Sequence, residues 1–349
     1  VSMIPKILSK SEADEISSCI DEAKHVVIVC HVAPDGDAIG SSLALWHTLA
    51  DLGKDVYVIV PDPYPASLRF LKGCKDILVY TRYTDFAQKL IERADLIFCL
   101  DFNEPKRVDS METVLMASKA KKILIDHHLY PSSFCDITIS HPEISSSCEV
   151  LFRVICGLGL FEQMSVDAAN AIYTGMMTDT GNFTYNSNYP EMYITIAELI
   201  KKGINKDTIY ARIHNTNSEE KLRLNGFAIS QKMEVFSEYD AAIISLSQKE
   251  LNHYHYQKGD TEGLVNVPLS MENILFSAFL REESNLIKIS LRSKGTFPAN
   301  KIASEYFNGG GHLNAAGGEF YGTLKEAEDL MHKILPVIGE LAIQSKKEQ

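Results

Sequence analysis

The stretch HVVIVCHVAPDGDAIGSSLALWHTLADLG, residues 25–53, decides the fold that we expect. It begins with a continuous apolar run, HVVIVC at 25–30, passes through a polar loop, and continues as a helical segment, AIGSSLALWHTLADLG, that stops at Gly53. A continuous apolar run, rather than an alternating one, suits a strand that is covered on both faces. The stretch therefore predicts one strand–loop–helix unit of an α/β sheet.

Three further apolar runs repeat this pattern, with helical stretches between them: DVYVIV at 55–60, DLIFCL at 95–100 and KKILID at 121–126. Alternation of buried strands and helices predicts a doubly wound, mostly parallel sheet. In such sheets, ligands bind at the carboxyl ends of the strands. We expect this α/β domain to cover residues 1–200.

From about residue 160 the pattern becomes helical, and we treat 201–232 as a helical connector to a smaller C-terminal α/β domain at 233–349. A helix is expected at 165–178 and further helices between residues 190 and 229. In the C-terminal domain we expect strands at 241–247, 272–282 and 285–293, a helix at 298–307, a glycine-rich turn, GGGHLNAAGG, at 309–318, and one last helix from Leu324 to near the terminus.

The charge of the 349-residue chain limits its partners. It carries 34 Lys and Arg against 46 Asp and Glu, for a net charge of −12. Proteins that track the phosphates of long nucleic acids usually present a broad basic face. The composition therefore argues against long duplex nucleic acid, while a small phosphorylated ligand can still be neutralised locally.

Cysteines and hydropathy indicate the compartment. The seven cysteines are scattered and form no CxxC pair, so we expect free thiols in a reducing cell. No apolar run approaches the ~20 residues that span a bilayer, and the N-terminus lacks a signal-peptide core. We therefore expect a cytoplasmic protein without a membrane partner.

Acidic and histidine side chains collect where the predicted strands end. Four segments contribute them: His31, Asp35 and Asp37; Asp101; Asp126, His127 and His128; and Asp179, at the end of helix 165–178. A single Asp after a strand is usually a turn former or a helix cap. Four such segments at one expected ligand-binding edge predict a metal site instead.

The types of ligand indicate the metal and its chemistry. Carboxylates with imidazoles and no thiolate suit Mn²⁺ or Mg²⁺, and the imidazoles favour Mn²⁺; Co²⁺ remains an alternative. Two divalent ions ~3.5–4 Å apart can activate water and clamp a phosphoryl oxygen. We expect Asp101 to bridge the two ions because it stands alone on a central strand.

Five motifs together resemble a known family. HVAPDGDAIGS, the isolated Asp101, DHH at 126–128 and DTG at 179–181 resemble the four motifs of the DHH phosphoesterase superfamily, and GGGHLNAAG at 309–317 resembles the signature of its DHH-associated C-terminal domain. The layout is similar to the NrnA-type oligoribonucleases, or nanoRNases, which degrade very short RNA and often dephosphorylate 3′-phosphoadenosine 5′-phosphate. RecJ-type exonucleases share both domains but carry additional ones.

The resemblance implies a role for each residue of the site. It assigns one ion to His31, Asp35 and Asp101, and the other to Asp37, Asp101, His127 and Asp179. His128 then faces the scissile phosphate as a donor, and Asp126 orients an imidazole. Gly36 is expected to let the loop turn tightly around a metal.

A substrate-binding group is expected in the C-terminal domain. Glycine backbone N–H groups can cradle a phosphate, and arginine suits bidentate phosphate binding. The expected contacts are Arg292, Ser293, Gly309, Gly310, Gly311 and His312. Phe183, after the DTG motif, is a candidate for base stacking, with a place in the core as the alternative.

We therefore expect an enzyme, a two-metal phosphoesterase that hydrolyses short oligoribonucleotides to mononucleotides and 3′-phosphoadenosine 5′-phosphate to AMP. The main alternative is a cytosolic phosphodiesterase of cyclic or linear dinucleotides. Less favoured alternatives are a RecJ-like exonuclease, an inorganic pyrophosphatase and a non-enzymatic nucleic-acid-binding module. The accessory module would predict degraded metal ligands, whereas every expected position holds the expected residue type. A homodimer is left open.

Overall fold

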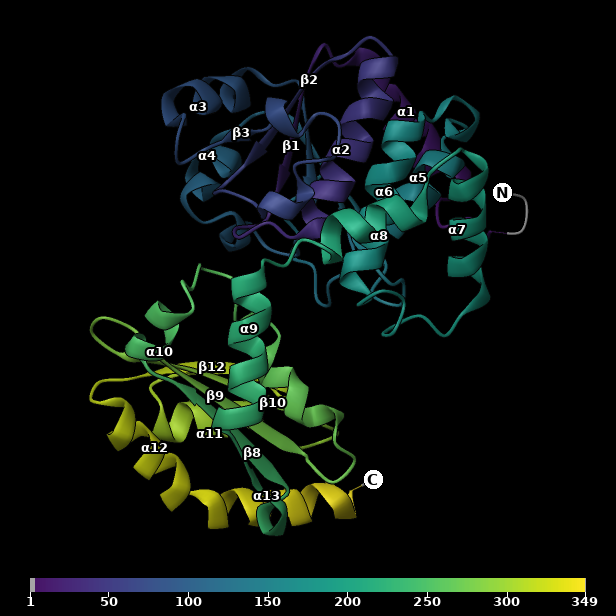
Figure 1. Ribbon diagram of the computed structural model, residues 1–349. Coiled ribbons are helices and arrows are strands. Elements are labelled where there is room, and N and C mark those ends of the chain that lie inside the picture. Colours follow the sequence, from purple (N-terminus) through teal and green to yellow (C-terminus); the bar gives the residue numbers. More distant parts are fainter. Residues whose placement is uncertain (1–3, 349) are drawn as a thin grey trace. The chain divides into compact units, whose positions relative to one another are not determined.

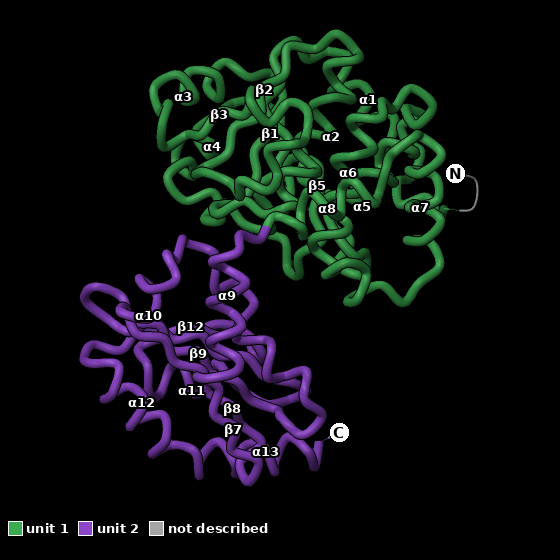
Figure 2. Tube along the Cα trace, viewed as in Figure 1, with its two compact units in different colours: residues 1–216 green, residues 217–349 purple. Residues whose placement is uncertain are grey.

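The computed structural model describes residues 4–348, and the chain divides into two compact units, Val1–Thr216 and Asn217–Gln349 (Figure 2). Each unit has a hydrophobic core of its own. The segment 201–232, expected to be a connector, is divided between them. Helix α8 (Lys206–His214) belongs to unit 1, and helix α9 (Glu219–Phe227) belongs to unit 2.

Unit 1 contains a parallel sheet in the order β3-β2-β1-β4-β5-β6, which confirms the doubly wound fold. Its strands are β1 (His25–Cys30), β2 (Asp55–Val60), β3 (Leu78–Val79), β4 (Leu96–Leu100), β5 (Lys121–Asp126) and β6 (Ile137–Ser140). The four expected strands form its centre. The edge strands β3 and β6 were not expected, because they are too short to give a periodic signal.

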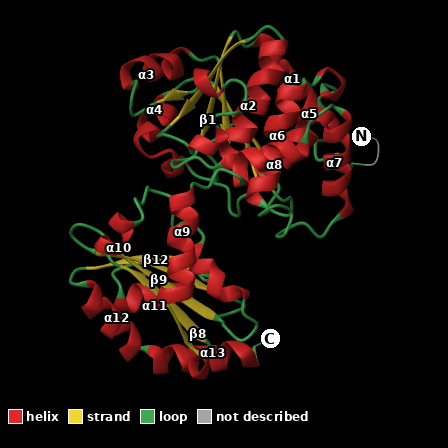
Figure 3. Ribbon diagram, viewed as in Figure 1, coloured by secondary structure: helices red, strands yellow, loops and turns green. Residues whose placement is uncertain are grey.

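Helices cover both faces of this sheet (Figures 1 and 3). Val26 and Ile28 pack into the core on the side of α2, α5 and α6, while Val27 and Val29 pack on the side of α3 and α4. This two-sided burial explains why β1 is apolar from Val26 to Cys30. The helices are α1 (Lys10–Glu22), α2 (Gly36–Asp51), α3 (Thr84–Arg93), α4 (Glu112–Ala117), α5 (Ser147–Gly157), α6 (Val166–Asp179), α7 (Pro190–Lys201) and α8.

The strand order reverses between β1 and β4, which are hydrogen-bonded neighbours. The chain leaves β1 toward β2 on one side and leaves β4 toward β5 on the other. A doubly wound sheet opens a crevice at the carboxyl ends of the strands where the order reverses. His31 and Asp101 are the first residues after β1 and β4, so the topology brings them to this point.

Unit 2 contains a second sheet in the order β11-β12-β10-β9-β8-β7, in which only the pair β8–β9 is parallel. Helices α11, α12 and α13 cover one face, and α9 and α10 cover part of the other. The strands are β7 (Met233–Phe236), β8 (Ala241–Leu246), β9 (Phe276–Glu282), β10 (Ile287–Ser293), β11 (Gly310–His312) and β12 (Ala315–Phe320); the helices are α9, α10 (Gln248–His253), α11 (Ala299–Tyr306), α12 (Leu324–Lys333) and α13 (Leu335–Lys347).

Two expectations for unit 2 were wrong in detail. The glycine-rich stretch is a hairpin of two strands, β11 and β12, rather than a turn alone. A Cβ at Gly309 would lie 2.0 Å from the Gly317 carbonyl oxygen, so the glycines permit a close backbone approach. The last helix is also two helices, α12 and α13, because Pro336 in the first turn of α13 cannot continue the preceding helix.

All seven cysteines lie in the part of the chain that the structure describes, and all are free thiols. Among residues 4–348, no helix combines the length and apolar character needed to cross a bilayer.

Candidate metal centre and substrate pocket

His31 presents one ring nitrogen to two carboxylates. Its Nδ1 lies 2.7 Å from the Val32 carbonyl oxygen, which can only accept, so Nδ1 carries a proton. The other nitrogen, Nε2, lies 3.3 Å from Asp101 Oδ2 and 3.8 Å from Asp35 Oδ1. His31, Asp35 and Asp101 thus form one group of potential metal ligands.

The start of helix α2 positions the two aspartates of the loop. Asp35 caps the helix, and its Oδ1 accepts hydrogen bonds from the backbone N–H groups of Asp37 and Ala38. Asp37, in the first turn, is buried. Gly36 is the first residue of α2, so its expected role in a loop turn is corrected. A Cβ there would lie 2.1 Å from Thr178 Oγ1, so Gly36 lets α2 and α6 pack closely.

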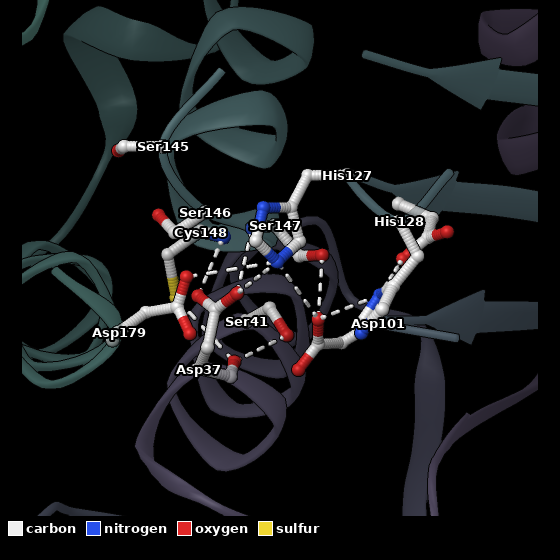
Figure 4. A network of polar contacts seen from close by, with 12 residues as sticks. Asp37, Ser41, Asp101, His127, His128, Ser145, Ser146, Ser147, Cys148 and Asp179 are labelled. Atoms are coloured by element: carbon white, nitrogen blue, oxygen red, sulfur yellow. Dashed lines mark hydrogen bonds and ion pairs between the residues drawn. The ribbon is translucent and has the colours of Figure 1, made fainter. Parts of the chain in front are cut away.

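His127 stands among three carboxylates (Figure 4). Its Nε2 lies 3.6 Å from Asp179 Oδ2, 3.7 Å from Asp101 Oδ1 and 3.9 Å from Asp37 Oδ2. Asp179 ends helix α6, and Asp101 leaves β4 with a φ of 63°. Such a left-handed backbone is uncommon for a residue with a side chain and is found at functional sites. One oxygen of Asp101 faces His31, and the other faces His127.

The N-terminus of helix α5 holds the buried carboxylates, a role that the sequence reasoning missed. The backbone N–H groups of Ser147 and Cys148 donate to Asp37 at 2.6 and 2.9 Å, and Ser147 Oγ donates to Asp101 Oδ1 at 2.8 Å. Ser146 caps this helix. The run SSSCE before an apolar helix is a recognisable capping signal that could have indicated the start of this helix, but not its contacts with Asp37 and Asp101.

The donor set fits divalent cations. Burial raises the pKa of Asp37, and the charges of Asp101 and Asp179 raise it further. Burial, followed by the charge of Asp35, likewise raises the pKa of Asp101. Buried carboxylates at this density need a compensating positive charge. The Nε2 of His31 has a lone pair facing a carboxylate oxygen, so a proton or a cation belongs between them.

His128 is oriented for a separate task. Its Nδ1 lies 2.8 Å from Oδ1 of the buried Asp126, which leaves Nε2 for a substrate. The pKa of His128 is raised, mainly by this hydrogen bond; burial opposes the rise, and the positive charge of Arg107 opposes it to a smaller extent. A raised pKa favours the imidazolium, which is a proton donor on both nitrogens.

Arg107 is a second residue that the sequence reasoning missed. Its carbonyl oxygen accepts from the Val32 N–H at 2.7 Å, which ties it to the loop of His31. Within residues 4–348, its buried Nε has no hydrogen-bond partner, and no carboxylate lies within 4 Å of its guanidinium. The only signal in the sequence is a basic residue shortly after Asp101.

Unit 2 holds a pocket of 540 Å³ beside its glycine hairpin. Of the expected substrate contacts, Arg292, Gly309, Gly310 and Gly311 line it together. Burial lowers the pKa of Arg292, as expected for a guanidinium withdrawn from water. A half-buried cation beside glycine backbone suits an anionic ligand.

Three other expected residues lie elsewhere. The Ser293 hydroxyl is buried and donates to the Phe297 carbonyl oxygen at 2.7 Å, so it holds the chain after β10. His312 is exposed on β11 and does not line this pocket. Phe183 packs against Tyr173, with 5.6 Å between ring centroids, which favours its place in the core over base stacking.

The chain is similar to proteins of known family. Residues 25–176 match the DHH family, N-terminal domain, and residues 241–340 match the DHHA1 domain. A bifunctional oligoribonuclease and PAP phosphatase NrnA from Thermus thermophilus is 31% identical over 90% of this chain and 89% of its own length. The protein of that name from Bacillus subtilis is 27% identical over 85% of this chain and 89% of its own length.

Solved structures agree with this similarity. An exopolyphosphatase-related protein from Bacteroides fragilis is 54% identical, with a TM-score of 0.91 over 97% of this chain and 99% of that one. RecJ from Thermus thermophilus in complex with Mn²⁺ shares the fold, with a TM-score of 0.55 and 14% identity over 96% of this chain and 55% of RecJ. The motifs, the carboxylate and histidine cluster and these relatives agree: the chain belongs to the DHH family of phosphoesterases, with a DHHA1 domain in its second unit.

Proposed function

We propose that this phosphoesterase hydrolyses short oligoribonucleotides to mononucleotides and removes the 3′-phosphate of 3′-phosphoadenosine 5′-phosphate. The observation that carries the proposal is the position of Asp101 between two groups of ligands, with Oδ2 3.3 Å from His31 Nε2 and Oδ1 3.7 Å from His127 Nε2. A carboxylate shared by two cation sites is typical of two-metal hydrolysis of phosphate esters. The two NrnA relatives support this choice of substrates.

We assign one Mn²⁺ ion to His31, Asp35 and Asp101, and a second to Asp37, Asp101, His127 and Asp179. Two groups, His31, Asp35 and Asp101, and Asp37, His127 and Asp179, each have their ligand atoms within 4.8 Å of one another and support the assignment. Asp101 joins the second set because its Oδ1 lies 3.7 Å from His127 Nε2. The mixture of carboxylates and imidazoles favours Mn²⁺, with Mg²⁺ or Co²⁺ as alternatives. When bound, two such ions would supply an activated water and charge neutralisation at the phosphoryl group.

The side chains of the protein supply the remaining functions. Helix α5 keeps Asp37 and Asp101 in place through the backbone N–H groups and the hydroxyl at its first turn. His128, held by Asp126, donates a hydrogen bond to the scissile phosphate or a proton to the leaving oxygen. Arg107 and Arg292 bind phosphate oxygens, since a guanidinium without a carboxylate partner suits such contacts. The glycine hairpin of unit 2 adds contacts beside Arg292, and His312, exposed on strand β11, adds a contact outside that pocket.

The enzyme should prefer substrates of two to about five nucleotides. The net charge of −12 gives a surface that repels a long polyanion. The test compares kcat/KM for a dinucleotide with that for a 24-mer of the same base, with Mn²⁺ and at fixed salt. We expect a higher value for the dinucleotide. An equal or higher value for the 24-mer would defeat the proposal and favour a RecJ-like role.

A second candidate substrate is inorganic polyphosphate, because the 54% identical Bacteroides fragilis protein is described as exopolyphosphatase-related. Tripolyphosphate, pyrophosphate and a cyclic dinucleotide therefore belong in the same substrate panel. We expect the linear dinucleotide and 3′-phosphoadenosine 5′-phosphate to be hydrolysed with the highest kcat/KM. A higher value for tripolyphosphate would replace the nucleotide assignment.

A further inference from the structure

One face of strand β10 carries a row of hydrogen-bond donors. Lys288, Ser290 and Arg292 occupy alternate positions of this strand. Alternate residues of a strand point to the same face, about 7 Å apart along it. Their neighbours Ile287, Ile289 and Leu291 point to the other face and are buried in the core of unit 2. The strand thus presents lysine, serine and arginine side by side on its open face.

Two pockets meet on this row. The 540 Å³ pocket beside the glycine hairpin and a 240 Å³ pocket under the loop 258–263 are both lined by Lys288, Ser290 and Arg292. The second pocket also contains Val265 and Phe279. Because three consecutive same-face residues belong to both pockets, the open face of β10 is a continuous groove that extends past Arg292.

The donors in the row have few acceptors in the protein. Across residues 4–348, no carboxylate lies within 4 Å of the charged group of Lys288 or Arg292, and the Ser290 hydroxyl makes no side-chain hydrogen bond. Within the described part of the chain, Arg292 donates only to two backbone carbonyls, those of Leu291 and Ala316.

The groove has other charged groups on its walls. Arg281 lies opposite Lys288 in the register but is already engaged by Tyr256, Thr261 and Glu283. Glu319 is the cross-strand neighbour of Lys288 on the other side, and it accepts a hydrogen bond from the Tyr321 hydroxyl. Lys258 and Glu262 of the loop also line the smaller pocket. Within residues 4–348, neither Glu262 nor Glu319 forms an ion pair with Lys288 or Arg292, so these two cations are free for a ligand.

We infer that this row is a track for successive phosphates of a short nucleotide substrate, in which Arg292 binds the first phosphate of the series, Ser290 the second and Lys288 the third. The inference rests on the proposed function and adds to it a device that reads substrate length. The spacing of alternate residues along a strand is comparable to that of successive phosphates in an extended single strand. Ser290, between the two cations, donates to an intervening phosphate oxygen. The preference of the enzyme for a given substrate length then depends on how many phosphates of the substrate contact the row.

The test adds one phosphate to a substrate without adding a nucleoside. The full-length protein with Mn²⁺ is assayed on the trinucleotide ApApA, which carries two phosphates, and on the same trinucleotide with a 5′- or a 3′-terminal phosphate, which carries three. We expect one of the two added phosphates to raise kcat/KM by about tenfold, the value of one modest charge-assisted contact. Lys288→Ala should remove most of this gain. Lys249→Ala, which changes an exposed lysine of α10 away from the groove, should keep it.

A second variant and a binding measurement complete the test. Ser290→Phe, which fills the groove, should also remove the gain, and the melting temperature of each variant reports whether it is folded. If no substrate is hydrolysed, the proposed function fails; the track is then tested by equilibrium binding of the same three compounds to the Asp101→Asn protein, with and without Lys288→Ala. The inference would be overturned if Lys288→Ala left the gain from the added phosphate intact. It would also be overturned if Lys288→Ala lowered kcat/KM, or the affinity, equally for all three compounds.

Discussion

Replacing Asp101 by asparagine separates the catalytic role of this carboxylate from its effect on the stability of the folded protein. Asparagine has nearly the same shape and can still accept the Ser147 hydroxyl hydrogen bond, so the fold should persist. It lacks the charge that two cation sites would share. We expect nearly complete loss of kcat and weaker binding of Mn²⁺, measured by steady-state kinetics and calorimetric titration.

The same substitution should stabilise the metal-free protein. An oxygen of Asp101 lies within 4.8 Å of an oxygen of Asp35. Two unit charges at that distance repel by ~3 kcal/mol at an effective dielectric constant of ~20. The exposure of Asp35 screens this repulsion, so we expect a net gain of ~1 kcal/mol. For a unit of this size, that corresponds to roughly 2–4 °C in melting temperature.

The pH dependence of this gain follows from the sign of the shift. Burial, followed by the charge of Asp35, raises the pKa of Asp101 in the folded state. The ionised group therefore destabilises the metal-free fold at pH values above its unfolded pKa, increasingly up to the folded pKa. The advantage of asparagine should be largest at neutral pH and shrink as the pH falls toward the ordinary range of an aspartate.

Calorimetric scans in chelator, with and without added Mn²⁺, measure both effects. Mn²⁺ should raise the melting temperature of the wild-type protein more than that of the variant. Binding to the native state stabilises it, and the variant binds Mn²⁺ more weakly. Retention of a tenth of the wild-type kcat would show that Asp101 is not the shared ligand. A lower melting temperature for the metal-free variant than for metal-free wild type would refute the electrostatic reasoning.

The remaining predictions concern the ions, the second unit and the packing beneath the site. Exhaustive chelation should abolish turnover and Mn²⁺ should restore it best; full activity in protein shown to be metal-free by elemental analysis would contradict the two-metal mechanism. Arg292→Ala and His312→Ala should each lower kcat/KM roughly 10–150-fold, from a loss of ~1.5–3 kcal/mol, while the metal stoichiometry stays unchanged; a fall in bound metal would contradict their assignment to substrate. Gly36→Ala should destabilise the protein by ~1–3 kcal/mol in denaturant unfolding, because its Cβ would lie 2.1 Å from Thr178 Oγ1. The matched control, Gly226→Ala in α9, meets no atom within 4 Å and should be neutral or stabilising; equal effects of the two changes would refute the packing argument.

The sequence alone determined the sheet of unit 1 and the set of candidate ligands. Strands covered on both faces are apolar along most of their length, so β1, β4 and β5 could be recognised from the continuous apolar runs at 26–30, 96–100 and 123–125. Because parallel strands end at one edge, the residues that follow them, such as His31 and Asp101, could be expected to converge. That inference requires only the order of strands and helices along the chain.

Only the tertiary structure decided how these side chains are held and what surrounds them. Ser147 and Arg107 reach the site through contacts between segments far apart in the chain, for which residue type alone gives no signal. Gly36 serves a helix–helix contact with Thr178 rather than a loop turn, a distinction that depends on atoms 142 positions away in the sequence. The open face of β10 depends on the packing of unit 2, because helices cover one face of its sheet and only part of the other face. Local patterns determine which elements form, whereas burial and hydrogen bonding between distant segments determine what each side chain can do.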